Sequence, residues 1–462
     1  MHMKMDTISA IILEAAENAK TETKDATSSR KVMSSGWPIK CTIGPGLEGA
    51  IACDSKVGYV NGSKGALIYR GYDILDLCVH SNYEEVCYLL IHGELPTKSQ
   101  FSEFNEKMKD FRSVNSTLRK LMGFPVEEMG AMSALRLGTN FMRHEMTQLD
   151  KRGFKPKGVA TISADEDSIP METPPTGEKS AKYEFKRQKR RKPSPDEASG
   201  VEACYHLIAG VATIAAAISR LQGGLLPIEP DPELSHAANL LYMINGERPS
   251  YDDERIMDVA LILHADHGMN ASTFASMVVA STLSDFYFSV GSGIAALNGP
   301  LHGGANEEVI RVLDKVLAYE GTPEQWVTEE LSKKSKIPGF GHRVYKTYDP
   351  RARVLGPLAE HLVKSHPDQK PIFDAAKKVE KKVVATLGKE KKIFPNVDYY
   401  SGIIYRCLGL APEMYTPIFA VSRVAGWTAR MLEYGANNRI FRPRARYTGH
   451  FDREYAPIKK RK

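Results

Sequence analysis

The sequence lacks the cysteine patterns that mark disulfide scaffolds and zinc ribbons. Its six cysteines are scattered over 462 residues without a Cys-x-x-Cys pair, which indicates reduced thiols. It also lacks a Gly-x-Gly-x-x-Gly motif after a strand and a Walker-type Gly-Lys-Ser/Thr, so dinucleotide and nucleoside-triphosphate chemistry are disfavoured. His264 and His267, three apart on one predicted helical face, could be a metal pair, but further ligands are not evident. One core histidine and one substrate contact is the favoured alternative, and we expect no metal.

A long uninterrupted apolar run is missing as well. The longest apolar stretch, from about residue 207 to 221, contains Arg220, which predicts a buried helix rather than a membrane span. The N-terminus has no apolar h-region and no small-residue cleavage site, and it carries acidic residues that a transit peptide would lack. We therefore expect a soluble, cytoplasmic protein.

Strong charge is confined to one place. The net charge is +6, and residues 186–192 alone contain six basic residues in seven. Outside that heptad the charges nearly balance, so a nucleic-acid surface is disfavoured. The heptad lies in residues 151–200, which are rich in proline and charge and poor in large apolar groups. This composition predicts a disordered insertion, and a solvated loop is favoured over a site for an acidic partner or nucleic acid.

The remaining chain has a predominantly helical pattern. Residues 1–36 are polar and rich in Ser, Thr and Lys, which predicts a flexible segment that is frayed or only partly helical. In residues 41–70, glycines separate short β-prone runs, which predicts two or three short strands in hairpins. Beyond Asp73, apolar residues recur at three- and four-residue spacing. The clearest predicted helices span residues 84–92, 99–112, 127–146, 203–221 and 231–244. The predicted fold class is all-α with a small β element near the N-terminus.

Three polar residues stand in glycine- or proline-marked settings in the last third of the chain. His302 lies in Gly-Pro-Leu-His-Gly-Gly, His342 in Gly-Phe-Gly-His-Arg, and Asp398 in Pro-Asn-Val-Asp. Two imidazoles and a carboxylate suit a reaction that removes a proton, steadies an oxyanion and protonates another atom. His302 precedes a predicted helix start, where a neutral, hydrogen-bond-donating imidazole is expected.

Each of these residues also has a structural alternative. His302 could be a capping or core histidine, and an aspartate placed like Asp398 most often caps a helix. The cations that follow His342 could be solvated surface charges. Their coincidence with glycines and a histidine favours an anionic substrate, with a phosphate-bearing molecule beside a carboxylate. These cations are Arg343, Lys346, Arg351 and Arg353.

Taken together, these stretches resemble the citrate synthase family. Seven motifs in family order carry the resemblance from about residue 41 to 450, interrupted by residues 151–200. They are Ala-Leu-Ile-Tyr-Arg-Gly-Tyr-Asp-Ile at 66–74, Leu-Ser-His-Ala-Ala-Asn-Leu-Leu-Tyr-Met at 234–243, Leu-His-Ala-Asp-His-Gly-Met-Asn-Ala-Ser-Thr at 263–273, Gly-Pro-Leu-His-Gly-Gly-Ala-Asn at 299–306, Pro-Gly-Phe-Gly-His-Arg-Val-Tyr-Lys at 338–346, Pro-Asn-Val-Asp at 395–398 and Val-Ser-Arg-Val-Ala-Gly at 421–426. Gly268 departs from the family pattern, in which many relatives carry Glu or Gln.

The resemblance implies a role for each candidate residue. Asp398 would take a methyl proton from acetyl-CoA, His302 would donate to the enol oxygen, and His342 would polarise and protonate the oxaloacetate carbonyl. The implied oxaloacetate ligands are His267, Arg351, Arg423 and Arg442, and the implied coenzyme A contacts are Arg343, Lys346 and Lys391. No cofactor is expected, because acetyl-CoA is a substrate. The product would be citrate, the entry to the tricarboxylic acid cycle.

The resemblance also implies a two-domain homodimer. A large domain would take residues 37–303 and 410–450, a small domain 304–409, and a tail 451–462, with Arg442 supplied to the other subunit's site. Two alternatives stay open: a 2-methylcitrate synthase that uses propionyl-CoA, and a non-catalytic scaffold that binds a partner through the basic insertion. One methylene is worth only about 1–3 kcal/mol in an apolar pocket, so the sequence motifs do not separate the two acyl-CoA substrates.

Overall fold

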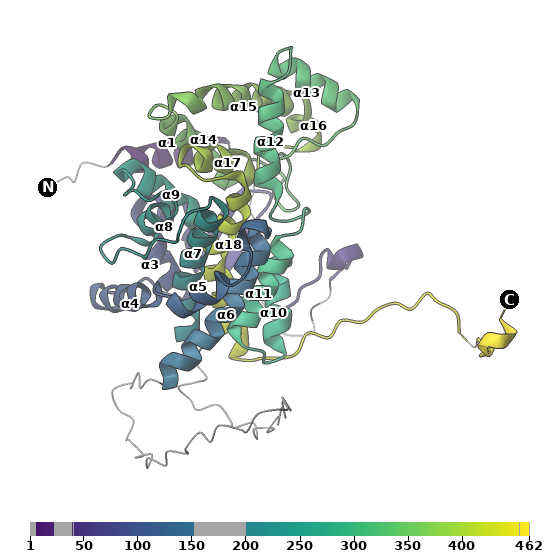
Figure 1. Cartoon of the computed structure of the whole chain (residues 1–462). Coiled ribbons are helices and arrows are strands. Elements are labelled where there is room, and N and C mark those ends of the chain that lie inside the picture. The colour runs from purple at the N-terminus through teal and green to yellow at the C-terminus, as the bar shows by residue number, and fades with distance from the viewer. Residues whose placement is uncertain (1–5, 23–38, 40, 152–199, 452, 462) are drawn as a thin grey trace.

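The computed structural model describes residues 6–22, 39, 41–151, 200–451 and 453–461. Helices make up most of this part of the chain, and its strands form one small sheet (Figure 1). The prediction of an all-α fold with a small β element is therefore confirmed. The predicted insertion lies almost wholly outside the described residues.

The sheet is a three-stranded antiparallel meander near the N-terminus. Its strands are β1 (Gly58–Asn61), β2 (Ala66–Tyr69) and β3 (Tyr72–Asp73), in the order β1-β2-β3. Arg70 and Gly71 form the tight turn between β2 and β3, and both have positive φ, as a twisted two-residue hairpin turn requires. Asp73 then caps the next helix by accepting a hydrogen bond from the Leu75 N–H at 2.9 Å. The three short antiparallel strands agree with the prediction of two or three short strands in hairpins.

A first group of helices follows the sheet. These helices are α2 (Ile74–His80), α3 (Tyr83–His92), α4 (Lys98–Phe111), α5 (Asn115–Leu121), α6 (Ala131–Lys151), α7 (Val201–Gln222), α8 (His236–Asn245), α9 (Tyr251–His264), α10 (Ala271–Ser281) and α11 (Phe286–Leu297). Two start later than their patterns predicted. Residues 126–128 form a 3-10 turn before α6, and Ser235 caps α8, so residues 231–235 remain outside the helix.

A second group of helices follows α11. It comprises α12 (Ala305–Leu317), α13 (Pro323–Ser332), α14 (Pro350–Leu362), α15 (Lys370–Val383), α16 (Lys389–Lys391), α17 (Val397–Cys407) and α18 (Tyr415–Gly435). Helices α12, α13, α15 and α16 lie at the upper end of Figure 1, and α14 contacts α9 of the first group. Helices α12 and α14 pack on α17, and α12 and α13 pack on α15. Helix α18 returns to pack against α3, α7 and α10 of the first group.

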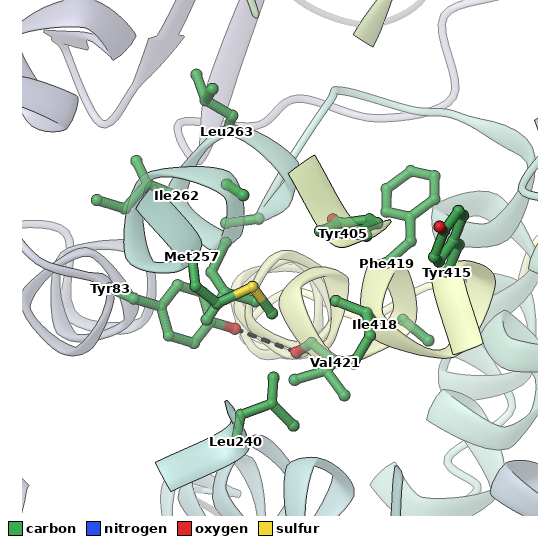
Figure 2. Packing of buried hydrophobic residues seen from close by; sticks show 14 of the residues in the cluster. Tyr83, Leu240, Met257, Ile262, Leu263, Tyr405, Tyr415, Ile418, Phe419 and Val421 are labelled. Carbon is green, nitrogen blue, oxygen red and sulfur yellow. Dashed lines mark hydrogen bonds between the residues drawn. The ribbon is translucent and has the colours of Figure 1, made fainter. Parts of the chain in front are cut away.

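The core is centred on α7 and α18, whose side chains are buried over nearly their whole lengths. Figure 2 shows side chains of α3, α8 and α9 packed around α18, where the Tyr83 hydroxyl donates to the Val421 carbonyl at 3.2 Å. Among the described helices, only α7 is long and apolar enough to cross a membrane by length and composition. However, 83% of its most apolar 18-residue stretch is buried inside the protein. The predicted buried helix is confirmed.

Part of the N-terminal segment forms a helix that packs against the rest of the protein. Residues Thr7–Glu22 form α1, which contacts α2, α9 and α14, and the side chains of Ile8 and Ile12 are fully buried there. Apolar residues at four-residue spacing within this segment provide the docking face, although its average composition is polar. A partly helical segment was predicted, but the docking of residues 7–22 through buried side chains was not.

Candidate active site

His302 lies in the loop between α11 and α12 and takes its orientation from the start of α10. Its Nε2 lies 3.2 Å from the Ser272 backbone N and 2.8 Å from the Ser272 hydroxyl oxygen. A backbone N–H only donates, so Nε2 acts as the acceptor and Nδ1 carries the proton of a neutral ring. Burial, aided by the Arg423 charge, lowers the pKa of His302 to about 4. His302 is therefore a neutral donor at neutral pH, as expected from its sequence setting.

His342 is fixed in the opposite tautomer by its own loop. The N–H groups of Val344 and Tyr345 donate to its Nδ1 at 2.9 and 3.1 Å, so Nε2 carries the proton. Gly339 and Gly341 flank it with φ of +81° and +83°, a backbone conformation that favours glycine. Burial, followed by the Arg351 charge, lowers the pKa of His342 to about 4. The two imidazoles thus offer N–H donors from different ring nitrogens.

His267 and His342 are in ring contact, with centroids 5.1 Å apart. The Nε2 of His267 lies 3.1 Å from the Tyr345 hydroxyl, and burial holds the pKa of His267 well below its ordinary value. Helix α9 ends at His264, so the two histidines do not share a helical face as predicted. His264 is the core histidine: it is fully buried, and its Nδ1 lies 2.7 Å from the Ala260 carbonyl.

Two buried guanidinium groups accompany the histidines. Arg351 is the second residue of α14 and donates to the Asp349 carboxylate from Nε at 3.0 Å and from Nη2 at 2.7 Å. Arg423 on α18 donates from Nε to the His264 carbonyl at 2.6 Å, and within the described residues it forms no ion pair. Burial lowers the pKa of Arg423 to about 10. A buried cation without a paired carboxylate is a strong attractor for a ligand anion.

Asp398 is the second residue of α17, and its carboxyl is buried. Its Oδ1 has no hydrogen-bond partner among the described residues. Burial raises the pKa of this carboxyl to about 7, although the Arg351 and Arg423 charges oppose the shift. The cap of α17 is Asn396, whose Oδ1 accepts from the Asp398 N–H at 3.0 Å, so the capping alternative for Asp398 is excluded. An unpaired carboxyl that titrates near neutrality suits a general base.

The effects of the Arg351 and Arg423 charges on neighbouring pKa values indicate that these groups share one site. The Arg423 charge acts on the pKa values of His302, His267 and Asp398. The Arg351 charge acts on those of His342, His267 and Asp398. Residues from α17, α18, the start of α14 and three loops therefore meet around a positive centre, which suits the binding of an anion.

The other predicted residues are exposed, and among them the Lys346 charge also acts on the pKa of His342. Arg442 is exposed on the extended chain that leaves the body after α18 (Figure 1), and its Nη1 contacts the Pro443 carbonyl at 3.4 Å. Arg343 is exposed and lies 3.6 Å from Glu48, and the Lys346 Nζ lies 3.4 Å from the Arg343 carbonyl. Lys391 is exposed at the end of α16. The described residues hold no group of three or more His, Cys, Asp or Glu that could bind a metal.

Sequence reasoning missed the residues that orient the site. Asn270 caps α10, which fixes the Ser272 N–H against His302, and Asp349 aligns Arg351. Asn396 donates from Nδ2 to the Gly341 carbonyl at 3.0 Å and so joins α17 to the His342 loop. Asn270 and Asn396 lie inside the quoted motifs at 263–273 and 395–398, and this was the only feature of the sequence that pointed to them. Gly268 has φ of +62°, so a side chain there would be strained.

Comparison with known proteins gives a consistent result. Residues 46–444 match the family model described as "Citrate synthase, C-terminal domain". The chain is 38% identical over 417 residues to a citrate synthase of Haloferax volcanii, covering 90% of this chain and 98% of the relative. It is 38% identical over 419 residues to a citrate synthase of Deinococcus radiodurans, covering 91% of this chain and 99% of the relative.

Solved structures agree with the sequence matches. The crystal structure of citrate synthase from Thermotoga maritima has a TM-score of 0.72 at 34% identity, covering 91% of this chain and all of that one. The structure of the ternary complex of carboxymethyl coenzyme A and oxaloacetate with citrate synthase from Thermoplasma acidophilum has a TM-score of 0.76 at 30% identity, with the same coverage.

Proposed function

The chain belongs to the citrate synthase family and is an acyltransferase of that type, and we propose that its site condenses acetyl-CoA with oxaloacetate and hydrolyses citryl-CoA to citrate. The observation that carries the proposal is Asp398. Its buried carboxyl has an unpaired oxygen and a pKa raised to about 7, in a site that also holds two neutral histidine donors. This combination suits removal of a weakly acidic proton next to a thioester carbonyl.

In the first step, Asp398 takes a proton from the methyl group of acetyl-CoA. The electron pair of that C–H bond moves toward the thioester oxygen, and His302 stabilises the resulting enol or enolate by donating from Nδ1–H. A neutral donor suits this role because it retains its proton throughout. The Ser272 N–H on Nε2 supports the assignment, since it leaves Nδ1 as the protonated nitrogen.

In the second step, the enolate carbon attacks the carbonyl carbon of oxaloacetate. His342 polarises that carbonyl through Nε2–H and then transfers the proton to the new alkoxide. Arg351, Arg423 and His267 hold the oxaloacetate carboxylates, and Arg442 is supplied by the partner subunit of a homodimer. The buried positive charge of Arg423, which has only a carbonyl contact, supports its role as a carboxylate ligand.

Hydrolysis of citryl-CoA then breaks the thioester C–S bond, releases coenzyme A as the thiol and makes the sequence irreversible. Arg343, Lys346 and Lys391 are the proposed coenzyme A contacts, and their exposure suits contact with phosphates at the mouth of a site. No metal or separate cofactor is needed for these steps. We also propose that the enzyme acts in the cytoplasm.

The proposed domain division places the large domain at residues 37–303 and 410–450 and the small domain at 304–409. Asp398 and His342 would then belong to the small domain, and His267, His302 and Arg423 to the large one. Closure of the two domains would exclude water from the enolate. The hydrogen bonds that join α17 to the His342 loop support movement of those two groups as one unit.

The test is release of coenzyme A thiol with oxaloacetate, with kcat/KM compared for acetyl-CoA and propionyl-CoA. A strong preference for acetyl-CoA is expected. A preference for propionyl-CoA would make the protein a 2-methylcitrate synthase with the same residue roles. Thiol release from neither substrate would favour the scaffold alternative, and deletion of residues 155–198 would then abolish binding of its partner.

A further inference from the structure

A cleft of about 470 Å³ lies at the opposite end of α9 from the catalytic histidines. It is framed by the end of α2, the first turns of α3 and α9, helix α4 and the turn at residues 233–235. Helix α9 has 14 residues, so its two ends lie about 20 Å apart. None of the residues assigned to the proposed reaction lines the cleft, which is therefore a separate site.

Two buried charge pairs line this cleft, and the first is closed. Asp258 accepts on one oxygen from the Tyr83 N–H at 2.8 Å and on the other from Arg255 Nη1 at 2.8 Å. Arg255 also donates to the Ser81 carbonyl at 3.0 Å. The charges of this pair are satisfied within the protein, so the pair has a structural role.

The second pair, Glu84 and Arg112, is open. Glu84 Oε1 accepts from the His236 N–H at 2.6 Å, and Arg112 Nη1 donates to the Leu234 carbonyl at 2.8 Å. The nearest approach of the two charged groups is 3.8 Å, which is too long for a hydrogen bond. The two side chains are only 8% and 4% exposed, so water does not screen this pair as it screens a surface pair.

Three buried polar atoms beside the cleft have no hydrogen-bond partner among the described residues. They are Glu84 Oε2, Arg112 Nε and, on α4, Asn105 Oδ1. Buried polar atoms in folded proteins are nearly always paired, so this cluster of one donor and two acceptors is unusual. The residues that carry these atoms line the cleft from the first turn of α3, which holds Glu84, and from α4 and its C-cap, which hold Asn105 and Arg112. The open pair leaves Glu84 Oε2 and Arg112 Nε without a partner among the described residues.

We propose that this cleft binds a small zwitterion, specifically a free α-amino acid. Its ammonium group faces Glu84 and Asn105, and its carboxylate faces Arg112, with Lys109 at the rim. The ligand side chain lies along Phe101. A simple anion would leave the two acceptors unpaired, and a simple amine would leave the donor unpaired. The cleft is lined by four carboxylates and three Lys or Arg side chains, a near balance that favours a ligand without net charge.

The first test is a screen of the full-length wild-type protein with each of the twenty L-amino acids, by thermal shift and then titration calorimetry. Saturating oxaloacetate is present throughout, so that the catalytic site is occupied. We expect at least one amino acid to raise the melting temperature, and its N-acetyl and carboxamide derivatives to have no effect. If no amino acid binds, or if a derivative binds as well as the parent, the proposal is overturned.

Variants then locate the site. Glu84→Gln removes the charge that faces the ammonium and is expected to weaken binding roughly ten- to hundredfold. Asn105→Trp fills the cleft from a half-buried position on α4, and is expected to abolish binding while thiol release stays normal. Glu103→Gln, an exposed change on the same helix that does not line the cleft, is the matched control. Amino-acid binding that survives Asn105→Trp unchanged would contradict the proposal, even if Glu84→Gln fails to fold.

Discussion

At the scale of single residues, protonation states are set by burial rather than by sequence neighbours. Asp398 and His302 both shift toward their neutral forms, and burial is the largest cause for each. The consequences differ, because a carboxyl with a pKa near 7 can accept a proton whereas an imidazole with a pKa near 4 holds one nitrogen-bound proton as a neutral donor. The same physical effect thus yields a base and a donor in one site.

The base assignment predicts the behaviour of Asp398→Asn. This change keeps the shape of the side chain and removes its proton-accepting charge. We expect kcat to fall about 10²- to 10⁴-fold while the Kd for oxaloacetate changes little. Steady-state kinetics and calorimetric titration with oxaloacetate measure the two effects. Near-normal turnover would remove Asp398 from the role of base.

The raised pKa of Asp398 also predicts linked pH effects on activity and stability. Activity needs the ionised carboxyl, so kcat/KM is expected to fall about tenfold per pH unit below pH 7. The pKa is about 7 in the folded protein and near its ordinary 3.8 when unfolded. The folded state therefore binds the proton more tightly, and the destabilising effect of the ionised group is relieved as pH falls from 7 toward 4.

Because ionised Asp398 destabilises the folded state, the free energy of unfolding of Asp398→Asn tests the raised pKa. At pH 8 the variant is expected to have a larger free energy of unfolding than the wild type, because it lacks the buried charge. The difference should shrink as the pH approaches 4. Urea denaturation at several pH values measures it. A variant that is less stable at pH 8 would mean that the carboxylate is stabilised by contacts absent from this structure.

At the scale of helices, α1 joins parts of the chain that are far apart in sequence. It contacts α2, α9 and α14, and the second residue of α14 is the oxaloacetate candidate Arg351. Ile12→Ala removes a fully buried side chain from this contact and should cost about 2–5 kcal/mol if the cavity does not collapse. Thermal unfolding tests this, with exposed Glu17→Ala as the control. An unchanged melting temperature would show that α1 is not docked.

A second helix-scale contact is made by the Glu380 carboxylate on α15. It accepts hydrogen bonds from the hydroxyls of Tyr348, six residues beyond His342, and Tyr400, two residues beyond Asp398. Glu380→Gln replaces one acceptor oxygen by a donor, so one of the two bonds is lost at a cost of about 1–3 kcal/mol. We expect lower stability and a reduced kcat, since the His342 loop and α17 lose a common anchor.

The matched control for this contact is Lys377→Met. It removes the partly exposed ion pair with the same carboxylate and leaves both tyrosine bonds in place. Such pairs contribute about 0–1 kcal/mol, so a small effect is expected. Equal effects of the two changes would argue against a special role for the tyrosine bonds.

At the scale of the whole molecule, Arg442 tests the proposed homodimer. It lies outside the site of its own chain, so the reaction requires a second subunit if Arg442 binds oxaloacetate. Arg442→Ala and Asp398→Asn should each be nearly inactive alone. Refolded together, half of the dimers are mixed and carry one intact site, so about a quarter of the wild-type activity should return. No recovery from a verified heterodimer would place Arg442 in its own subunit or outside the reaction.

The sequence by itself determined the fold class, the family and the identity of the candidate catalytic residues. Helical periodicity and the seven motifs are local properties of the chain, and each can be recognised without knowing what packs against it. The same local approach did not predict the docking of residues 7–22, because docking of a short amphipathic face depends on distant partners. It also assigned His264 and His267 to one helical face, although the helix ends between them.

Only the tertiary structure decided which ring nitrogen of His302 and of His342 is protonated and which residue caps α17. It also decided which cations lie at the centre of the candidate active site. Those properties depend on burial and on hydrogen-bond donors from elements far apart in sequence, such as the Ser272 N–H that faces His302. The cleft at Glu84 and Arg112 also depends on the tertiary structure, since α3, α4 and the turn before α8 meet there only in the folded chain. Burial and long-range pairing, which create these sites, leave no local pattern in the sequence.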